Sequence, residues 1–309
     1  MDGLLRALAG VALMGAAVIR AQGPPVIREP RTLRSSVEVT AVTATVRDAD
    51  GRLVPNLPRS RFEVYEDGIP QAITQFTSER VPVGVGLLLD VSDSMFGQRI
   101  LDARAVVERF LVDLLAPDDA FFVMTFNHQP QLLKPWTDPV DRASVSTALD
   151  KLRAWGGTSI YDAVADALPL MEQRTRDRAA LVLISDGADT TSDVTLHRLR
   201  DRLLRTDAFI YAIAIDSTTR QTINVRVNPT ALSEITNQTG GRTEVVKDTA
   251  GLASATARIA EELNTQYVLG YSSPHPGDGK YHSIRVRVNG DGYRVRARNG
   301  YVAGQVKTR

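Results

Sequence analysis

The sequence predicts an α/β protein with a doubly wound, mostly parallel sheet and a smaller all-β, sandwich-like domain. Two continuous apolar runs, residues 83–89 and 179–184, are typical of parallel strands that are covered on both faces. Strand-like and helix-like segments alternate between residues 82 and 264. The segments at both chain ends alternate with the two-residue period of half-exposed strands. These three observations separate an α/β region from two β regions.

The α/β region contains alternating elements, which predict a mostly parallel sheet with helices on both faces. Residues 98–115, for example, place Ile100, Ala103 and Val107 on one helical face. A short antiparallel strand is expected at residues 131–134. The other expected strands are 120–126, 208–215 and 243–246, and the other expected helices are 141–152, 159–172, 195–205, 229–237 and 251–264.

The two chain ends each have three expected strands and too few residues to bury a core alone. We therefore expect them to join into one β domain, with the α/β region inserted between them. Asn289-Gly290-Asp291-Gly292 predicts a hairpin turn between the last two strands. The expected strands are 36–46, 62–66 and 71–78 before the α/β region, and 266–271, 281–288 and 293–298 after it. The predicted boundaries are 1–22 for a signal peptide, 23–35 for a linker, 36–81 and 265–303 for the β domain, 82–264 for the α/β domain and 304–309 for a tail.

Residues 7–19 form an uncharged apolar run of 13 residues between Arg6 and Arg20. This length fits the apolar part of a secretory signal and is too short for an ordinary membrane span. The segment predicts export to the periplasm, the cell surface or the medium, and no integral span in the mature chain. The alternative is an N-terminal helix that stays attached, either buried or as an anchor.

The composition is that of an ordinary soluble globular protein, with 43% hydrophobic and 24% charged residues. The formal net charge of +1 gives no sign of a nucleic-acid partner. There is no cysteine, which excludes disulfides, thiolate metal sites and cysteine catalysis.

Three separated stretches supply oxygen ligands for a divalent metal: Asp90 to Ser94, Gly157-Thr158 and Ser185 to Gly187. The first and third follow the two buried strands. Because ligands in an open α/β sheet collect at the carboxyl ends of its strands, we expect the stretches to meet. Hard cations such as Mg²⁺ (or Mn²⁺) prefer carboxylate and hydroxyl oxygens. The predicted ligands are Asp90, Ser92, Ser94, Thr158 and Asp186.

This Asp-x-Ser-x-Ser, Thr and Ser-Asp-Gly pattern resembles the metal-ion-dependent adhesion site of the von Willebrand factor type A family. The resemblance covers about residues 82–264, and the flanks are most similar to secreted bacterial members with the VWFA-related Acidobacterial domain. It implies a Rossmann-like fold and an adhesion-type binding module rather than an enzyme. The metal would take a carboxylate from a protein partner that presents an acidic side chain.

Each proposed ligand also has an ordinary structural interpretation. Ser94 and Thr158 could cap the helices that follow them, and Ser185-Asp186-Gly187 could be a turn. Asp93 and Asp189 are more typical of solvated or capping residues, and Asp162 is expected to support the nearby loop. The complete set in the right order favours the metal site. Two rival functions stay open: a structural domain whose metal only stabilises the loops, and a metal-dependent hydrolase.

Other chemistry has little support. His128, His197, His275 and His282 follow no ligand spacing and are expected at the surface or in turns. There is no Gly-x-Ser-x-Gly nucleophile motif and no phosphate-binding glycine-rich loop, so we predict no enzymatic activity. The last expected hairpin carries a basic stripe, for which a solvated strand face is favoured over an anionic partner. Its members are Arg285, Arg287, Arg294, Arg296 and Arg298.

Overall fold

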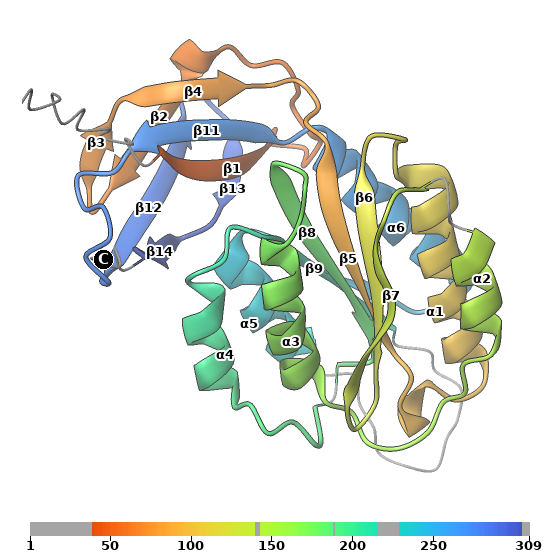
Figure 1. Cartoon of the computed structure of the whole chain (residues 1–309). Coiled ribbons are helices and arrows are strands. Elements are labelled where there is room, and N and C mark those ends of the chain that lie inside the picture. Colours follow the sequence, from red (N-terminus) through yellow and green to blue (C-terminus); the bar gives the residue numbers. More distant parts are fainter. Residues whose placement is uncertain (1–38, 140–142, 188, 216–228, 305–309) are drawn as a thin grey trace, which may run out of the picture. The chain divides into compact units, whose positions relative to one another are not determined.

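The computed structural model describes residues 39–139, 143–187, 189–215 and 229–304 (Figure 1). All of these described residues belong to one compact unit. The predicted signal peptide (1–22), the linker (23–35) and residues 305–309 of the predicted tail lie outside the described residues. No helix in the described ranges has both the length and the apolar character that crossing a membrane requires.

A six-stranded sheet lies at the centre of the α/β part, with strand order β10-β9-β8-β5-β6-β7. All neighbours are parallel except β7, which runs antiparallel to β6 as the sequence predicts. Every residue of β5, β6, β8 and β9 is buried, which explains their continuous apolar runs. The strands are β5 (Val83–Asp90), β6 (Ala120–Phe126), β7 (Pro130–Thr137), β8 (Arg178–Ser185), β9 (Phe209–Ile215) and β10 (Thr243–Val246).

Helices cover both faces of this sheet (Figure 1). Alternate residues of β5 enter two separate cores: Leu87 and Leu89 pack with α1 and α6, whereas Leu88 packs with α3, α4 and α5. One core therefore contains α1 (Gln98–Arg109), α2 (Ala143–Asp150) and α6 (Thr249–Asn264), and the other contains α3 (Ile160–Glu172), α4 (Leu196–Leu203) and α5 (Pro229–Thr239). The helix predicted to reach residue 115 instead ends in a π-helical turn, Phe110–Leu114.

Two antiparallel four-stranded sheets make up the β part, with orders β13-β1-β11-β4 and β14-β12-β2-β3. Each sheet contains strands from both chain ends, and a shared apolar core that includes Val42, Phe62, Tyr267 and Ile284 lies between them. The predicted fold class is therefore confirmed. The strands are β1 (Val39–Arg47), β2 (Phe62–Glu66), β3 (Ile69–Gln71), β4 (Ile73–Thr77), β11 (Tyr267–Ser272), β12 (Tyr281–Val288), β13 (Arg294–Ala297) and β14 (Gly300–Val302).

The predicted hairpin between the last two long strands is wrong. β12 pairs with β2 and β14, whereas β13 pairs with β1 in the other sheet. Gly290 and Gly292 do have positive φ, but the turn carries the chain from one sheet to the other. The basic stripe is divided accordingly. Arg285 and Arg287 are exposed on β12, and Arg296 on β13 reaches Glu262 of α6.

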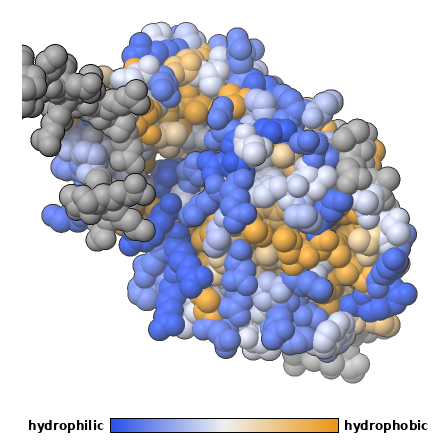
Figure 2. Space-filling view, viewed as in Figure 1, coloured by the Kyte–Doolittle hydropathy of each residue, from blue (hydrophilic) through white to orange (hydrophobic). Residues whose placement is uncertain are grey.

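The β sheets adjoin the amino end of the central sheet, because β4 leads into β5 and α6 leads into β11 (Figure 1). At about 3.3 Å per residue, the eight residues of β5 carry the chain roughly 26 Å away from that junction. The loops after β5 and β8 therefore lie at the far end of the α/β part. In Figure 2 an apolar area crosses the edge strand β7, where Leu132 is 43% exposed.

Candidate metal centre

Two of the predicted ligands begin neighbouring loops at the carboxyl edge of the sheet. β5 and β8 are paired in register, with Leu89 opposite Ile184, so the loops that start at Asp90 and after Ser185 emerge side by side. The hydroxyl of Ser185 donates to Asp90 Oδ2 at 2.6 Å. Asp90 and Asp186 are both fully buried. The sheet therefore brings two acids together away from water.

Two hydroxyls lie over the same edge. A single helical turn, Asp93–Met95, follows Ser92 and brings Ser94 Oγ to 3.0 Å from Ser92 Oγ. The backbone N–H of Ser92 donates to Asp90 Oδ1 at 2.8 Å. Helix α1 begins after Gly97 without a side-chain cap. The hydroxyl of Ser94 therefore faces Ser92 and does not cap the helix, which was its alternative role.

Thr158 belongs to a loop that is tied to both other stretches. Trp155 N donates to Val91 O and Asp93 N donates to Gly156 O, each at 2.9 Å. Thr190 N donates to Thr158 O at 2.8 Å. Thr158 is 4% exposed, and its hydroxyl makes no hydrogen bond within the described residues. The hydroxyl of this largely buried residue is therefore available to a ligand.

Glycine is required where this loop packs. A Cβ on Gly157 would lie 2.4 Å from Thr191 Cγ2, far inside van der Waals contact. Gly156 adopts φ of +80°, which side chains of L residues rarely allow. The two glycines let the loop of Thr158 approach the loop that follows Asp186.

Asp186 has an oxygen with no protein partner. Its Oδ1 is buried and accepts no hydrogen bond from any described residue. Its Oδ2 lies 3.3 Å from Arg99 Nη1, which also donates to Ser94 O at 2.9 Å. A buried polar atom without a partner calls for a physical explanation, and the binding of a cation is one such explanation. Arg99 was not recognised from the sequence as part of this site.

The electrostatics also favour a cation. The pKa of Asp90 is raised to about 7, chiefly by burial and also by the nearby charge of Asp186, while hydrogen bonds from Ser185 and Ser92 oppose the rise. An ionised Asp90 is therefore costly unless positive charge lies close by. Two buried acids, a pair of hydroxyls and the hydroxyl of Thr158 are the types of oxygen donor that suit a hard divalent cation. The residues that are present fit the metal.

The neighbouring acids have structural roles. Asp162 Oδ2 and Oδ1 accept from the backbone N–H groups of Asp193 and Val194 at 2.9 and 2.8 Å, so Asp162 supports the loop that follows Asp186. Asp189 Oδ1 accepts from Tyr161 N at 3.3 Å, at the start of α3. Asp93 is exposed.

The profile of the von Willebrand factor type A domain matches residues 85–188, a span that contains all five predicted ligands. The chain contains a von Willebrand factor type A (vWA) domain. Among curated relatives, inter-alpha-trypsin inhibitor heavy chain H4 of Bos taurus is 28% identical over 123 residues, which are 37% of this chain and 13% of that protein. The alpha-2/delta-3 subunit of a voltage-dependent calcium channel of Mus musculus is 31% identical over 147 residues, 43% of this chain and 13% of that protein. The chain thus spans about an eighth of the length of these two relatives.

Solved structures share the vWA fold. A von Willebrand factor type A protein from Catenulispora acidiphila matches with a TM-score of 0.51 at 13% identity, covering 88% of this chain and 75% of that one. Proximal thread matrix protein 1 from the mussel byssus, in a form with a zinc-occupied metal-ion-dependent adhesion site, matches with a TM-score of 0.50 at 16% identity, covering 63% and 48%. At these identities the likeness concerns the fold.

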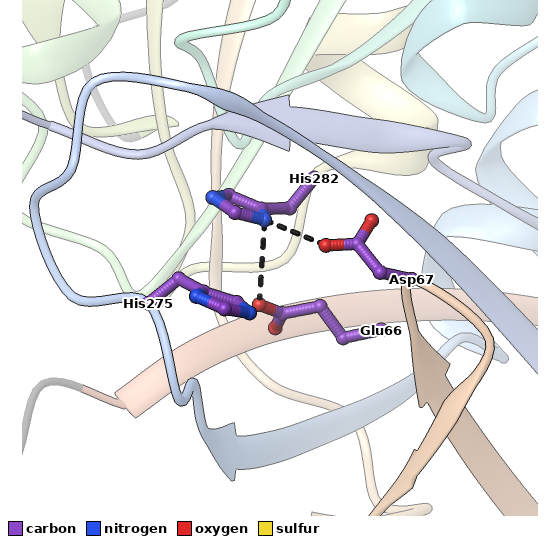
Figure 3. A group of neighbouring side chains, drawn as sticks. All are labelled: Glu66, Asp67, His275 and His282. Atoms are coloured by element: carbon purple, nitrogen blue, oxygen red, sulfur yellow. Dashed lines mark hydrogen bonds and ion pairs between the residues drawn. The ribbon is translucent and has the colours of Figure 1, made fainter.

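One cluster of side chains was missed entirely. His282 is 4% exposed, so its expected surface position is wrong. It lies with His275, Glu66 and Asp67 in the β part (Figure 3). No local spacing in the sequence indicates this group, because Asp67 and His282 are 215 positions apart and meet only through the pairing of β2 with β12.

Proposed function

We propose that the vWA domain is an exported, metal-dependent protein-binding module of the adhesion type. The observation that carries this proposal is the buried, unpartnered Oδ1 of Asp186 beside a second buried acid, Asp90, and two clustered hydroxyls. Export rests on the apolar segment 7–19 and is tested by N-terminal sequencing of protein expressed from the full chain.

The metal would be held by Asp90, Ser92, Ser94, Thr158 and Asp186. Mg²⁺ or Mn²⁺ suits oxygen-only ligands, and the zinc in the mussel protein makes Zn²⁺ a competitor to include. A coordination shell in which three of five protein ligands are neutral hydroxyls leaves the cation electron-poor. A carboxylate from an acidic side chain of a partner protein would complete it.

The surface beside the site suits a protein partner. Phe96 is 66% exposed and Trp155 is 56% exposed, and each lies two residues from a proposed ligand or its supporting glycine. Backbone hydrogen bonds join the loops that carry them. Exposed aromatic residues around a charged centre are typical anchors of protein interfaces. A partner could therefore place its carboxylate on the metal and apolar groups on these two rings.

Calorimetric titration with Mg²⁺ tests the metal. We expect wild-type protein to bind one Mg²⁺ at this site, and Asp186→Ala and Thr158→Ala to lose that binding. Asp193→Ala removes an exposed carboxylate a few residues beyond Asp186 and should bind as the wild type does. Equal affinity in Asp186→Ala and wild type would contradict the proposed ligands.

An affinity pull-down with and without EDTA tests the partner. The proposal requires a bound protein that is lost both in EDTA and in Asp186→Ala. A partner that is retained in both would favour a metal that only stabilises the loops. A hydrolytic turnover that disappears in Asp186→Ala would favour the hydrolase.

A further inference from the structure

Four potential metal ligands meet in the β part, away from the vWA site. Glu66 ends β2, Asp67 follows it in a turn, His282 lies on β12, and His275 lies in the connection between β11 and β12. One ligand atom from each residue lies within 4.8 Å of the corresponding atom of every other (Figure 3). β2 and β12 are neighbouring strands, with Glu66 opposite Ile284, so the arrangement is built into the sheet.

Glu66 has an unused oxygen in this cluster. The residue is 1% exposed, and its Oε1 accepts from Ser273 Oγ at 2.7 Å. Its Oε2 is buried and makes no hydrogen bond among the described residues. The buried hydroxyl of Tyr271 lies near this carboxylate, since burial and then the interaction with Glu66 raise the pKa of Tyr271. A buried carboxylate with a free oxygen is costly, because its desolvation is only partly compensated.

His282 is oriented as metal-binding histidines are. Its Nδ1 lies 2.7 Å from Asp67 Oδ2 and 3.9 Å from Glu66 Oε1. Its Nε2 lies 3.0 Å from Asp278 Oδ1. Histidines that bind a metal through one ring nitrogen commonly give the other to a carboxylate, which fixes the orientation of the ring. Asp278 is placed for that role.

The second imidazole completes the set. The rings of His275 and His282 are stacked, with centroids 4.5 Å apart and planes 5° from parallel. Figure 3 shows a nitrogen of each ring turned toward the carboxylate of Glu66. Two atoms that share a metal at about 2.1 Å lie at most about 4.2 Å apart. The distances of 2.7 and 3.9 Å satisfy this limit, and all four ligand atoms lie within 4.8 Å of one another. Because a metal lies near the plane of each imidazole that binds it, the half-buried His275 would rotate out of its stacked position to bind.

We propose that Glu66, Asp67, His275 and His282 form a second metal site, for Zn²⁺ or a similar transition-metal dication, with Asp278 as a positioning residue. Imidazole and carboxylate together suit Zn²⁺, whereas an oxygen-only site suits Mg²⁺. The metal would join residues that are 215 positions apart, and would thereby fasten the two chain ends that share the β sheets.

An ion-pair network is the competing explanation. Burial disfavours the charged form of His282, but its hydrogen bonds to Asp67 and Asp278 outweigh this effect and raise its pKa. That network accounts for both nitrogens of His282. It leaves Glu66 Oε2 with only the nearby Tyr271 hydroxyl as a possible partner, and it gives the ring nitrogens of His275 no partner among the described residues. A metal would account for both.

Calorimetric titration of tag-free, full-length protein with Zn²⁺ tests the proposal. The Asp186→Ala variant is used as the background, so that the vWA site does not contribute. We expect it to bind one Zn²⁺, and the added change His275→Ala to weaken binding by at least tenfold. Asp278→Asn should weaken it by roughly 10–100-fold, as the loss of an orienting carboxylate does elsewhere. His197→Ala removes an exposed histidine of α4 and should change nothing.

Two further measurements separate binding from folding. In the Asp186→Ala background Zn²⁺ should raise the melting temperature, and it should not do so after His275→Ala. X-ray absorption at the zinc edge should show imidazole nitrogens at about 2.0–2.1 Å. If Asp186→Ala binds no Zn²⁺, or binds it equally with and without His275, the second site is overturned. Either result leaves the Mg²⁺ test of the vWA site unaffected.

Discussion

Arg47 Nη2 on β1 lies 2.9 Å from Glu262 Oε2, near the end of α6. Glu262 is fully buried and also pairs with Arg242, at 3.3 Å, and with Arg296 of β13. Tyr211 of β9 donates its hydroxyl to the same carboxylate at 2.9 Å. One buried acid therefore joins the β part to the last helix and the central sheet of the vWA domain.

We expect Glu262→Gln to destabilise the protein by about 3–5 kcal/mol, because removal of one partner leaves buried charge uncompensated. Three guanidinium groups lose their shared counter-charge, while the shape of the side chain is kept. Urea unfolding at pH 7 measures the change. The neighbouring Glu261→Gln alters an exposed residue and should stay within about 0.5 kcal/mol of the wild type. Equal effects of the two changes would show that the ion cluster adds nothing to stability.

The same carboxylate should make stability sensitive to acid. Burial raises the pKa of Glu262, but Arg296 and the other arginines outweigh it, so the net pKa lies below its usual value. Glu262 therefore binds a proton more readily in the unfolded chain than in the folded protein. The stabilisation that its ionised carboxylate gives the folded protein is lost as the pH falls below about 4. The difference in unfolding free energy between wild type and Glu262→Gln should therefore shrink between pH 5 and pH 3. A difference that stays constant over this range would contradict the assignment.

The metal site could be predicted because its two acids directly follow strands that the sequence itself indicates. Residues 83–89 and 179–184 read as buried strands from their apolar runs alone, and parallel neighbours must end at the same edge. The acids that follow them, Asp90 and Asp186, were therefore expected to meet. Arg99 was not expected there, because an arginine in the first turn of a helix is usually solvated and nothing in its spacing indicates a buried carboxylate.

The β part was less predictable because its strands pair over long distances. A two-residue period shows which face of β12 is buried, and it does not show that β2 is the neighbour. The glycine-rich turn after β12 suggested a local hairpin, yet β13 lies in the other sheet beside β1. The cluster of Glu66 and His282 depends on that long-range pairing, so it became visible only in the structure.

Arg99 should weaken metal binding. Its guanidinium lies 3.3 Å from Asp186 Oδ2, so it competes with a divalent cation for this carboxylate and repels it. We expect Arg99→Gln to tighten Mg²⁺ binding by about 3–10-fold, which corresponds to roughly 1 kcal/mol of repulsion. Calorimetric titration measures this change. Arg109→Gln removes an exposed arginine at the other end of α1 and is the matched control. Weaker binding in Arg99→Gln would instead mean that Arg99 chiefly positions the loop through Ser94 O.

The exposed rings beside the site should affect the partner and not the metal. Trp155 contacts the proposed site through its backbone, with its N–H on Val91 O, while its indole packs edge-on against His128 and remains 56% exposed. Trp155→Ala and Phe96→Ala should therefore leave Mg²⁺ affinity unchanged. Each substitution should lower the affinity for the captured partner by about tenfold or more, as the loss of an aromatic anchor does in other interfaces.

Biolayer interferometry with the partner recovered in the pull-down measures this effect. Val245→Ala, which shortens an exposed apolar side chain on β10, is the control and should bind as the wild type does. If Trp155→Ala lowers Mg²⁺ affinity as well, its loop shapes the metal site and the ring is not a separate contact. If neither aromatic change affects the partner, recognition rests on the metal and the partner's carboxylate alone, and the contact surface must lie elsewhere around the site.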